Sequence, residues 1–84
     1  MSKQMEVQVG TTIVLIDESD RKKKVFHLVP GNLADAGRGR ISPASPLAAE
    51  LIGRKGGEVI HLELPKGAVV YRIHSVSETH EPAA

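Results

Sequence analysis

The stretch Ile41–Gly53 reads ISPASPLAAELIG and predicts one short helix with a defined start and end. Ser45 is a suitable N-cap, because its hydroxyl can accept a hydrogen bond from a free N–H group of the first turn. Pro46 fits the following position, where a backbone N–H would have no helical partner. Gly53 can adopt the left-handed conformation that commonly closes a helix.

The helix needs a partner to be stable. Two turns are marginal in isolation, so burial of an apolar face has to hold the helix in place. Leu47, Leu51 and Ile52 recur at spacings of four and five residues and form one apolar stripe. We therefore expect the stripe to pack on a sheet.

Four segments around the helix have the composition of β-strands. They are rich in β-branched and apolar residues and are bounded by Gly, Pro or clusters of polar residues. They are Thr11–Asp17 (TTIVLID), Lys23–Val29 (KKVFHLV), Val59–Leu64 (VIHLEL) and Ala68–Val76 (AVVYRIHSV). The first two should form an antiparallel hairpin through a loop over Asp17–Lys22. Gly31–Arg40, with three glycines and alternating charges, is expected to be a loop.

The last two strands should form a second hairpin. A turn at Lys66-Gly67 brings all the large apolar residues of both strands onto one face. In that register the expected pairs are Leu64 with Val69, Leu62 with Tyr71, Ile60 with Ile73 and His61 with Arg72. The other face is then mainly polar, as in a half-buried hairpin.

These elements predict an α+β fold: a twisted antiparallel sheet of about four to five strands packed on one short α-helix. At 84 residues the chain has room for one domain, which buries only about 60% of the surface that the unfolded chain exposes. We expect a flexible N-terminus over residues 1–6, the domain over residues 7–76 and a disordered tail over residues 77–84.

The composition argues against several classes of function. The net charge of +1 is far from the basic excess of a protein that neutralises many phosphates. Phe26 and Tyr71 are the only aromatic residues, too few for a base-stacking platform. No direct, sequence-specific binding of nucleic acid is therefore expected. The lack of cysteine fits a reducing compartment, and with no apolar run of membrane-spanning length we expect a cytoplasmic protein without membrane contact.

The polar residues do not form a recognisable catalytic or metal site. The four histidines lack ligand spacing, and no His or Asp is placed beside a serine by local geometry, so neither a metal, a cofactor nor a nucleophile is predicted. The basic run Arg21–Lys24 is more easily read as solvated loop charge than as a phosphate contact. Arg38, Arg40, Arg54 and Lys55 lie in the loops before and after the helix, where convergence on one edge would suit an acidic protein surface.

An ordered set of short motifs resembles the C-terminal domain of the bacterial Gre transcript-cleavage factors. The motifs are Val9–Leu15, Ile41-Ser42, Ser45–Ala48, Leu51–Gly53, Gly57–Val59, Pro65 with Gly67, and Tyr71 with Ile73. The resemblance implies a fold like that of the FK506-binding prolyl isomerases. It also implies docking on the rim of the secondary channel of bacterial RNA polymerase, partly through the loop and helix start around the Ser-Pro pair.

Two departures from the family pattern shape the functional expectation. In Gre factors an N-terminal coiled coil carries the acidic residues that help to hold a metal ion for cleavage. A helical hairpin rising about 1.5 Å per residue needs several tens of residues, and only about ten precede the first strand here. The residue before Ser-Pro is commonly Asn or Asp, whereas here it is Ala44.

The resemblance thus implies a non-enzymatic module that binds polymerase and modulates elongation without transcript cleavage. The candidate interface residues are Ser45, Pro46, Leu47, Arg40, Arg54 and Lys55. Ser45, Pro46 and Leu47 fit equally well a purely structural role, in which they cap and bury the helix.

Two other functions remain open from the sequence. The chain could be a small structural or adaptor domain, a monomer or weak homodimer, that self-associates or binds another protein through an exposed strand edge. A prolyl isomerase is disfavoured, because two aromatic residues can scarcely line the pocket such an enzyme needs.

Overall fold

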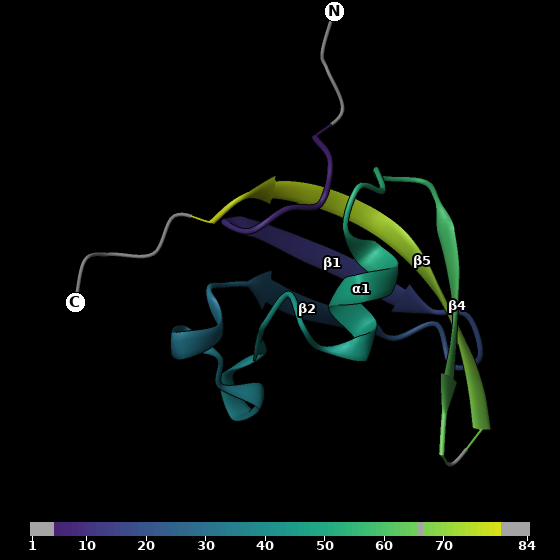
Figure 1. Ribbon diagram of the computed structural model, residues 1–84. Helices are drawn as coiled ribbons and strands as arrows, with labels where there is room; N and C mark the ends of the chain where they lie inside the picture. Colours follow the sequence, from purple (N-terminus) through teal and green to yellow (C-terminus); the bar gives the residue numbers. More distant parts are fainter. Residues whose placement is uncertain (1–4, 66, 80–84) are drawn as a thin grey trace, which may run out of the picture.

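The computed structural model describes residues 5–65 and 67–79, which form a five-stranded sheet with one α-helix on one face (Figure 1). The strand order is β3-β2-β1-β5-β4. The strands are β1 (Thr11–Asp17), β2 (Lys23–Leu28), β3 (Arg40–Ile41), β4 (Val59–Leu64) and β5 (Gly67–Glu78), and the helix is α1 (Pro46–Leu51). All neighbouring strands are antiparallel except β2 and β3, which pair in parallel. The predicted fold class is confirmed, with a short parallel strand added at one edge.

The first hairpin forms where the sequence predicts it. β1 alternates strictly between buried and half-buried residues, and its partner β2 follows after the turn. Asp17 closes this turn: its Oδ1 accepts hydrogen bonds from the backbone N–H of Ser19 (2.8 Å) and from the Ser19 hydroxyl (2.6 Å). The Asp17 N–H donates in turn to the carbonyl of Lys22 at 3.0 Å.

Helix α1 has the predicted caps. The Ser45 hydroxyl accepts from the backbone N–H of Ala48 at 3.2 Å, and Gly53 has a φ of 88°. Ala48 and Leu51 are fully buried. The prediction that Ile52 lies on the packed stripe is wrong, since 45% of its surface is exposed. Its ψ of 130° takes the chain off the helical path, so helical spacing no longer decides where this side chain points.

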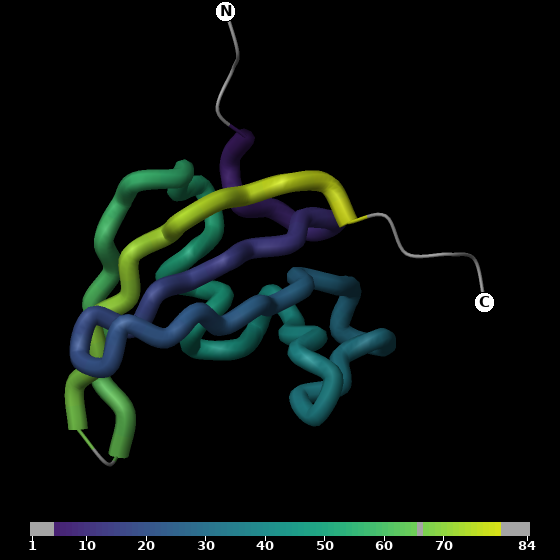
Figure 2. The backbone as a smooth tube through the Cα atoms, turned by 180° about the vertical axis from the view of Figure 1, so that it is seen from behind, coloured from purple at the N-terminus to yellow at the C-terminus, as the bar shows by residue number. Residues whose placement is uncertain are grey.

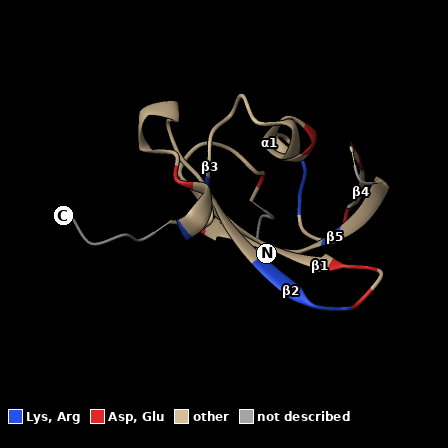
Figure 3. Ribbon diagram, turned by 90° about the horizontal axis from the view of Figure 1, so that it is seen from below, with Lys and Arg blue, Asp and Glu red and all other residues tan. Residues whose placement is uncertain are grey.

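The core lies between α1 and one face of the sheet. Besides Ala48 and Leu51, its buried members are Val7, Ile13, Leu15, Leu28, Ile60, Leu62, Tyr71 and Ile73. Figure 3, seen from below, shows α1 on one side of the sheet and no helix on the other. None of the helices in the described residues has the length and apolarity needed to cross a membrane.

The register of the second hairpin differs from the prediction by two residues. β4 and β5 pair Leu64 with Gly67, Leu62 with Val69, Ile60 with Tyr71 and His61 with Val70. Pro65 thereby becomes the first residue inside the turn, a position that its fixed φ favours, and Gly67 takes the last turn position, where glycine is common. A shift of two preserves the alternation of faces, so the apolar face was predicted correctly although the partners were not.

Three predicted boundaries also differ. Ser77 and Glu78, assigned to the tail, belong to β5 and pair with Thr12 and Thr11, while residues 80–84 lie outside the described residues. Glu6, assigned to the N-terminus, forms an antiparallel bridge with Lys55. The expected loop over 31–40 contains two 3-10 turns, Gly31–Leu33 and Ala36–Arg38, and ends in β3. These pairings join segments far apart in sequence, which local patterns do not reveal.

The long strand β5 bends where it crosses from β4 to β1. Its register against β1 shifts between Val14 and Leu15, whose partners are Ser75 and Ile73, so His74 is the extra residue of a β-bulge. Seen from behind in Figure 2, β5 curves beside β1, and β2 follows on the far side of β1. The bulge lets one strand serve as neighbour to both β1 and β4.

Candidate functional site

The start of α1 presents the Ser-Pro pair at the surface. Ser45 is half-buried and its hydroxyl is occupied by the cap, whereas the ring of Pro46 is exposed and Leu47 is half-buried against the core. Pro46 is therefore the most exposed of these three residues relative to its size. Ser45 caps the helix and Leu47 packs against the core, as a structural role requires. Pro46 has neither task and is available for contact.

A residue that the site prediction did not include organises this segment. The backbone N–H of Ala44 donates to the Ser42 hydroxyl at 3.0 Å, and the Ser45 N–H donates to the Ser42 carbonyl at 3.0 Å. Ser42 thus fixes the turn that leads Ser45 into its capping position. A serine whose hydroxyl accepts from the N–H two residues later is a common local turn. The sequence therefore contained the signal that identifies Ser42.

Arg54 and Lys55 lie at the opposite end of α1. The Arg54 Nε donates to the carbonyl of Glu50 in the last helical turn at 2.9 Å, and its Nη1 lies 3.5 Å from Glu58 Oε1. The other oxygen of Glu58 accepts from the backbone N–H of Lys55 at 2.7 Å. Arg54 is engaged in closing the helix, while the Lys55 side chain is exposed. The six residues of α1 span about 9 Å along the axis, which separates this pair from Pro46.

Arg40 occupies a third location. It lies in β3, at the opposite edge of the sheet from β4, and pairs with His27 of β2. Backbone bonds in both directions between Arg40 and Asp35, 2.9 and 3.0 Å long, hold it at the base of the preceding loop. Arg38 pairs with Asp35 at 3.6 Å on the exposed loop. The candidate residues are thus distributed around α1 and along one edge of the sheet, and do not form one compact cluster.

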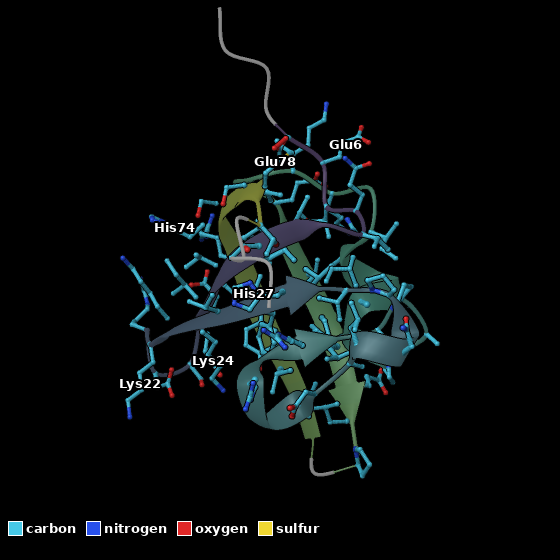
Figure 4. All side chains as sticks on the ribbon, turned by 90° about the vertical axis from the view of Figure 1, so that its left-hand side faces the viewer. Glu6, Lys22, Lys24, His27, His74 and Glu78 are labelled. Carbon is cyan, nitrogen blue, oxygen red and sulfur yellow. The ribbon has the colours of Figure 1, made fainter. Side chains whose placement is uncertain are left out.

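The basic run at the first hairpin lies apart from α1. Figure 3 shows this run on β2 and its turn, and in Figure 4 Lys22 and Lys24 lie at the other end of the view from Glu6 and Glu78. Lys24 lies 4.0 Å from Asp17 Oδ2 and 5.7 Å from the centre of the Tyr71 ring. At least this lysine therefore has a role in the sheet.

The fold changes the titration of the Asp17 carboxyl group. The hydrogen bonds from the Ser19 hydroxyl and the Ser19 N–H, helped by the charge of Lys24, hold the pKa of Asp17 below its ordinary value of 3.8, although burial opposes this. A carboxylate held by hydrogen bonds in a turn has a structural role. Across residues 5–65 and 67–79, no three His, Asp or Glu side chains are grouped so that they could hold a metal ion.

Residues 2–78 match the family model described as "Transcription elongation factor, GreA/GreB, C-term". The chain belongs to this family. Among curated Gre-family relatives, the transcription elongation factor GreA of Bradyrhizobium diazoefficiens is 44% identical over 70 residues, which cover 83% of this chain and 45% of the relative. GreA of Rhodopseudomonas palustris strain BisA53 is 44% identical over 77 residues, which cover 92% of this chain and 48% of the relative. The chain spans about half the length of these relatives.

Solved structures of the Gre family share the fold. Gfh1 of Thermus aquaticus superposes with a TM-score of 0.79 at 25% identity, covering 89% of this chain and 50% of that one. The GreA/GreB factor of Nitrosomonas europaea superposes with a TM-score of 0.77 at 25% identity, and the match covers 90% of this chain and 63% of that one. The resemblance inferred from the motifs is confirmed, and so is the fold. The choice of interface residues stays a prediction.

Proposed function

We propose that this chain is a binding module for bacterial RNA polymerase that modulates elongation at the rim of the secondary channel without supplying transcript cleavage. The single observation that carries the proposal is the family match over residues 2–78 to the C-terminal domain of elongation factors. A protein with this role acts in the cytoplasm, where polymerase is found.

The start of α1 is the proposed centre of contact. Pro46 is exposed on a helix whose position is fixed by its cap and by two fully buried residues, Ala48 and Leu51. A rigid exposed apolar residue loses little conformational entropy on binding, which favours its use at an interface. Ala44 offers no polar side chain beside it, so affinity here depends more on apolar contact and on Ser42, which orders the turn.

Arg54, Lys55 and Arg40 are proposed as outlying contacts. Arg54 and Lys55 follow the far end of α1 and Arg40 lies on β3, so these charges are separate from the central contact. Charges at the rim of an interface act mainly on the association rate and on its salt dependence. We therefore expect them to tune binding to an acidic surface while Pro46 and Leu47 determine whether binding occurs.

Binding is tested by measuring the affinity of the labelled chain for purified bacterial core RNA polymerase. Pro46→Glu should abolish or strongly weaken binding while keeping the fold, because an acidic residue is favourable in the first turn of a helix. Ala49→Glu is the matched control, since it places the same charge at another exposed position of α1 and should bind as the unmodified chain does. Absence of binding by the unmodified chain would refute the proposal.

The second part of the proposal concerns cleavage. When the chain is added to stalled elongation complexes, we expect transcript cleavage to stay at the level of polymerase alone, while a full-length GreA raises it. Excess chain should then reduce the effect of GreA by occupying the same site. Stimulation of cleavage by the chain itself would contradict the non-catalytic role but not the binding role.

A further inference from the structure

The two edges of the sheet differ in how they end. At one edge, β3 pairs with β2, and Gly39 lies close to Val25: a Cβ on Gly39 would lie 2.9 Å from the Val25 carbonyl oxygen. At the other edge lies β4, and Figures 1 and 3 show no element beyond it. Among the described residues, β4 is therefore the strand whose outer edge is uncovered along its whole length, whereas the outer edge of β2 is uncovered only over residues 23–25, before its pairing with β3 begins at His27.

The free backbone groups of β4 can be identified from its pairing. The N–H of Ile73 donates to the carbonyl of Glu58 at 2.8 Å, which places the carbonyl of Glu58 on the β5 side. Because backbone groups alternate along an antiparallel strand, Ile60, Leu62 and Leu64 also direct theirs toward β5. The N–H and carbonyl groups of Val59, His61 and Glu63 therefore point outward.

Within residues 5–65 and 67–79, these outward backbone groups have no hydrogen-bond partner. The side chains of His61 and Glu63 are likewise exposed and without a partner in that part of the chain. Unpaired backbone groups along a strand are a template for another strand. The edge thus offers both backbone and side-chain groups to a partner.

We propose that β4 is a homodimer interface, at which β4 of a second copy of this chain pairs antiparallel with it. The two-fold axis lies at Leu62, so that His61 of each copy faces Glu63 of the other. An imidazole N–H can donate to a carboxylate oxygen, and both cross-strand pairs form at once by symmetry. The two sheets become one continuous sheet.

The charges select this register over its neighbours. Only registers that bring outward-pointing residues into hydrogen-bonded pairs are possible, and these differ by steps of two residues. One neighbouring register places His61 opposite His61 of the second copy and Glu63 opposite Val59. The other places Glu63 opposite Glu63, which is repulsive. The register centred on Leu62 alone makes both pairs complementary.

A second copy is favoured because β4 is the strand that presents an uncovered edge along its whole length among the described residues. Pairing of β4 with the other edge of another copy would build an open chain of molecules, but β3 covers that edge at His27 and Leu28. The uncovered part, residues 23–25, carries two lysines, which disfavour pairing with another strand. An isologous contact closes after two copies. A six-residue strand buries less than the roughly 1,600 Å² of a standard interface, so the dimer is weak and concentration-dependent.

Sedimentation equilibrium from low micromolar to millimolar concentration tests the dimer. We expect the mass of the unmodified chain to rise from 9.0 kDa toward twice that value. His61→Glu places a second carboxylate opposite Glu63 and should weaken association about tenfold, since the altered pair occurs twice. Glu63→Lys should weaken it as well. The double variant H61E/E63K restores opposite charges across the axis and should restore the dimer.

Hydrogen exchange of the unmodified chain gives a second measurement that needs no variant. The amides of Val59, His61 and Glu63 should exchange more slowly as concentration rises, while those of β2 should not change. A constant mass up to millimolar concentration, failure of the double variant to restore association, or protection at β2 instead of β4 would each overturn the proposal. Polymerase binding is measured separately, so its outcome does not bear on this interface.

Discussion

Helix α1 and the outer loop, which we define as residues 31–39, are both excursions from the sheet, but they are held in different ways. α1 buries Ala48 and Leu51 completely. The outer loop has no buried residue, and the hydrogen bonds within it are short-range, such as Ala34 N–H to the Gly31 carbonyl at 3.2 Å. The difference shows that a segment can be ordered by burial or by local bonds, and that only the first couples it strongly to the rest of the molecule.

The largest effect expected from this comparison comes from truncating a leucine in each segment. Leu51→Ala leaves a cavity beneath α1 and should lower the free energy of unfolding by about 2–5 kcal/mol. Leu33→Ala removes the same atoms from a side chain that is 54% exposed, and should change stability by less than about 0.5 kcal/mol. Urea unfolding of both variants measures the difference, and similar losses would contradict it.

The next effect concerns the place where the outer loop touches the sheet. Gly39 has a φ of 74°, and a Cβ there would lie 2.9 Å from the Val25 carbonyl oxygen. Gly39→Ala should therefore lower stability by about 1–3 kcal/mol, because strain and a backbone clash act together. Urea unfolding measures this loss as well.

Gly31→Ala is the control for that substitution. Gly31 lies in the same loop, with no atom within 4 Å of an added Cβ and no positive φ. It should stay within about 0.5 kcal/mol of the unmodified chain. If both glycine variants were equally unstable, the loop would be coupled to the sheet along its whole length and the comparison would fail.

A smaller effect is expected at the cap of α1. Ser45→Ala removes the acceptor for the Ala48 N–H and should cost about 1 kcal/mol, whereas Ser45→Asp keeps a capping oxygen and should stay close to the original stability. Thermal unfolding followed by circular dichroism measures both variants. An unstable Asp variant would show that the serine has a role beyond capping.

The smallest effect is a loss of stability at acidic pH, which originates at Asp17 in strand β1 of the sheet. The pKa of Asp17 is lowered in the folded protein, so the unfolded chain binds the proton first as pH falls. The stabilisation is fully present above about pH 4 and is lost as pH falls through the folded pKa. Asp17→Asn should flatten the loss of stability below pH 4, measured by urea unfolding at several pH values. If the variant lost stability below pH 4 as the unmodified chain does, other carboxylates would be responsible for that loss.

Local signals in the sequence predicted the parts of this fold that local chemistry decides. The Ser45 cap, the left-handed Gly53 and the first hairpin each depend on residues a few positions apart, and all are present. The register of β4 and β5 was missed because two registers place the same residues on the apolar face. The pattern of faces predicted a turn at Lys66-Gly67, whereas the turn preferences of Pro65 and Gly67 favour the observed register.

The remaining features depend on contacts between distant segments. β3 has two residues and exists because β2 lies beside it, and Ser77 and Glu78 are strand residues because β1 offers them partners. For the same reason the sequence could name Arg40, Arg54 and Lys55 as basic residues near the helix but could not place them. Their positions follow from the path of the chain between β2 and α1 and from the bridge between Glu6 and Lys55.

The central place of β1 in the sheet has a consequence for the order of folding. The two hairpins join residues close in sequence and can form within microseconds. Pairing β1 with β5 instead brings Asp17 to Tyr71 and Thr11 to Glu78, which requires closure of the entire chain between them. We therefore expect the rate-limiting step to be the docking of one preformed hairpin on the other, with His74 in the bulge setting the angle at which they meet.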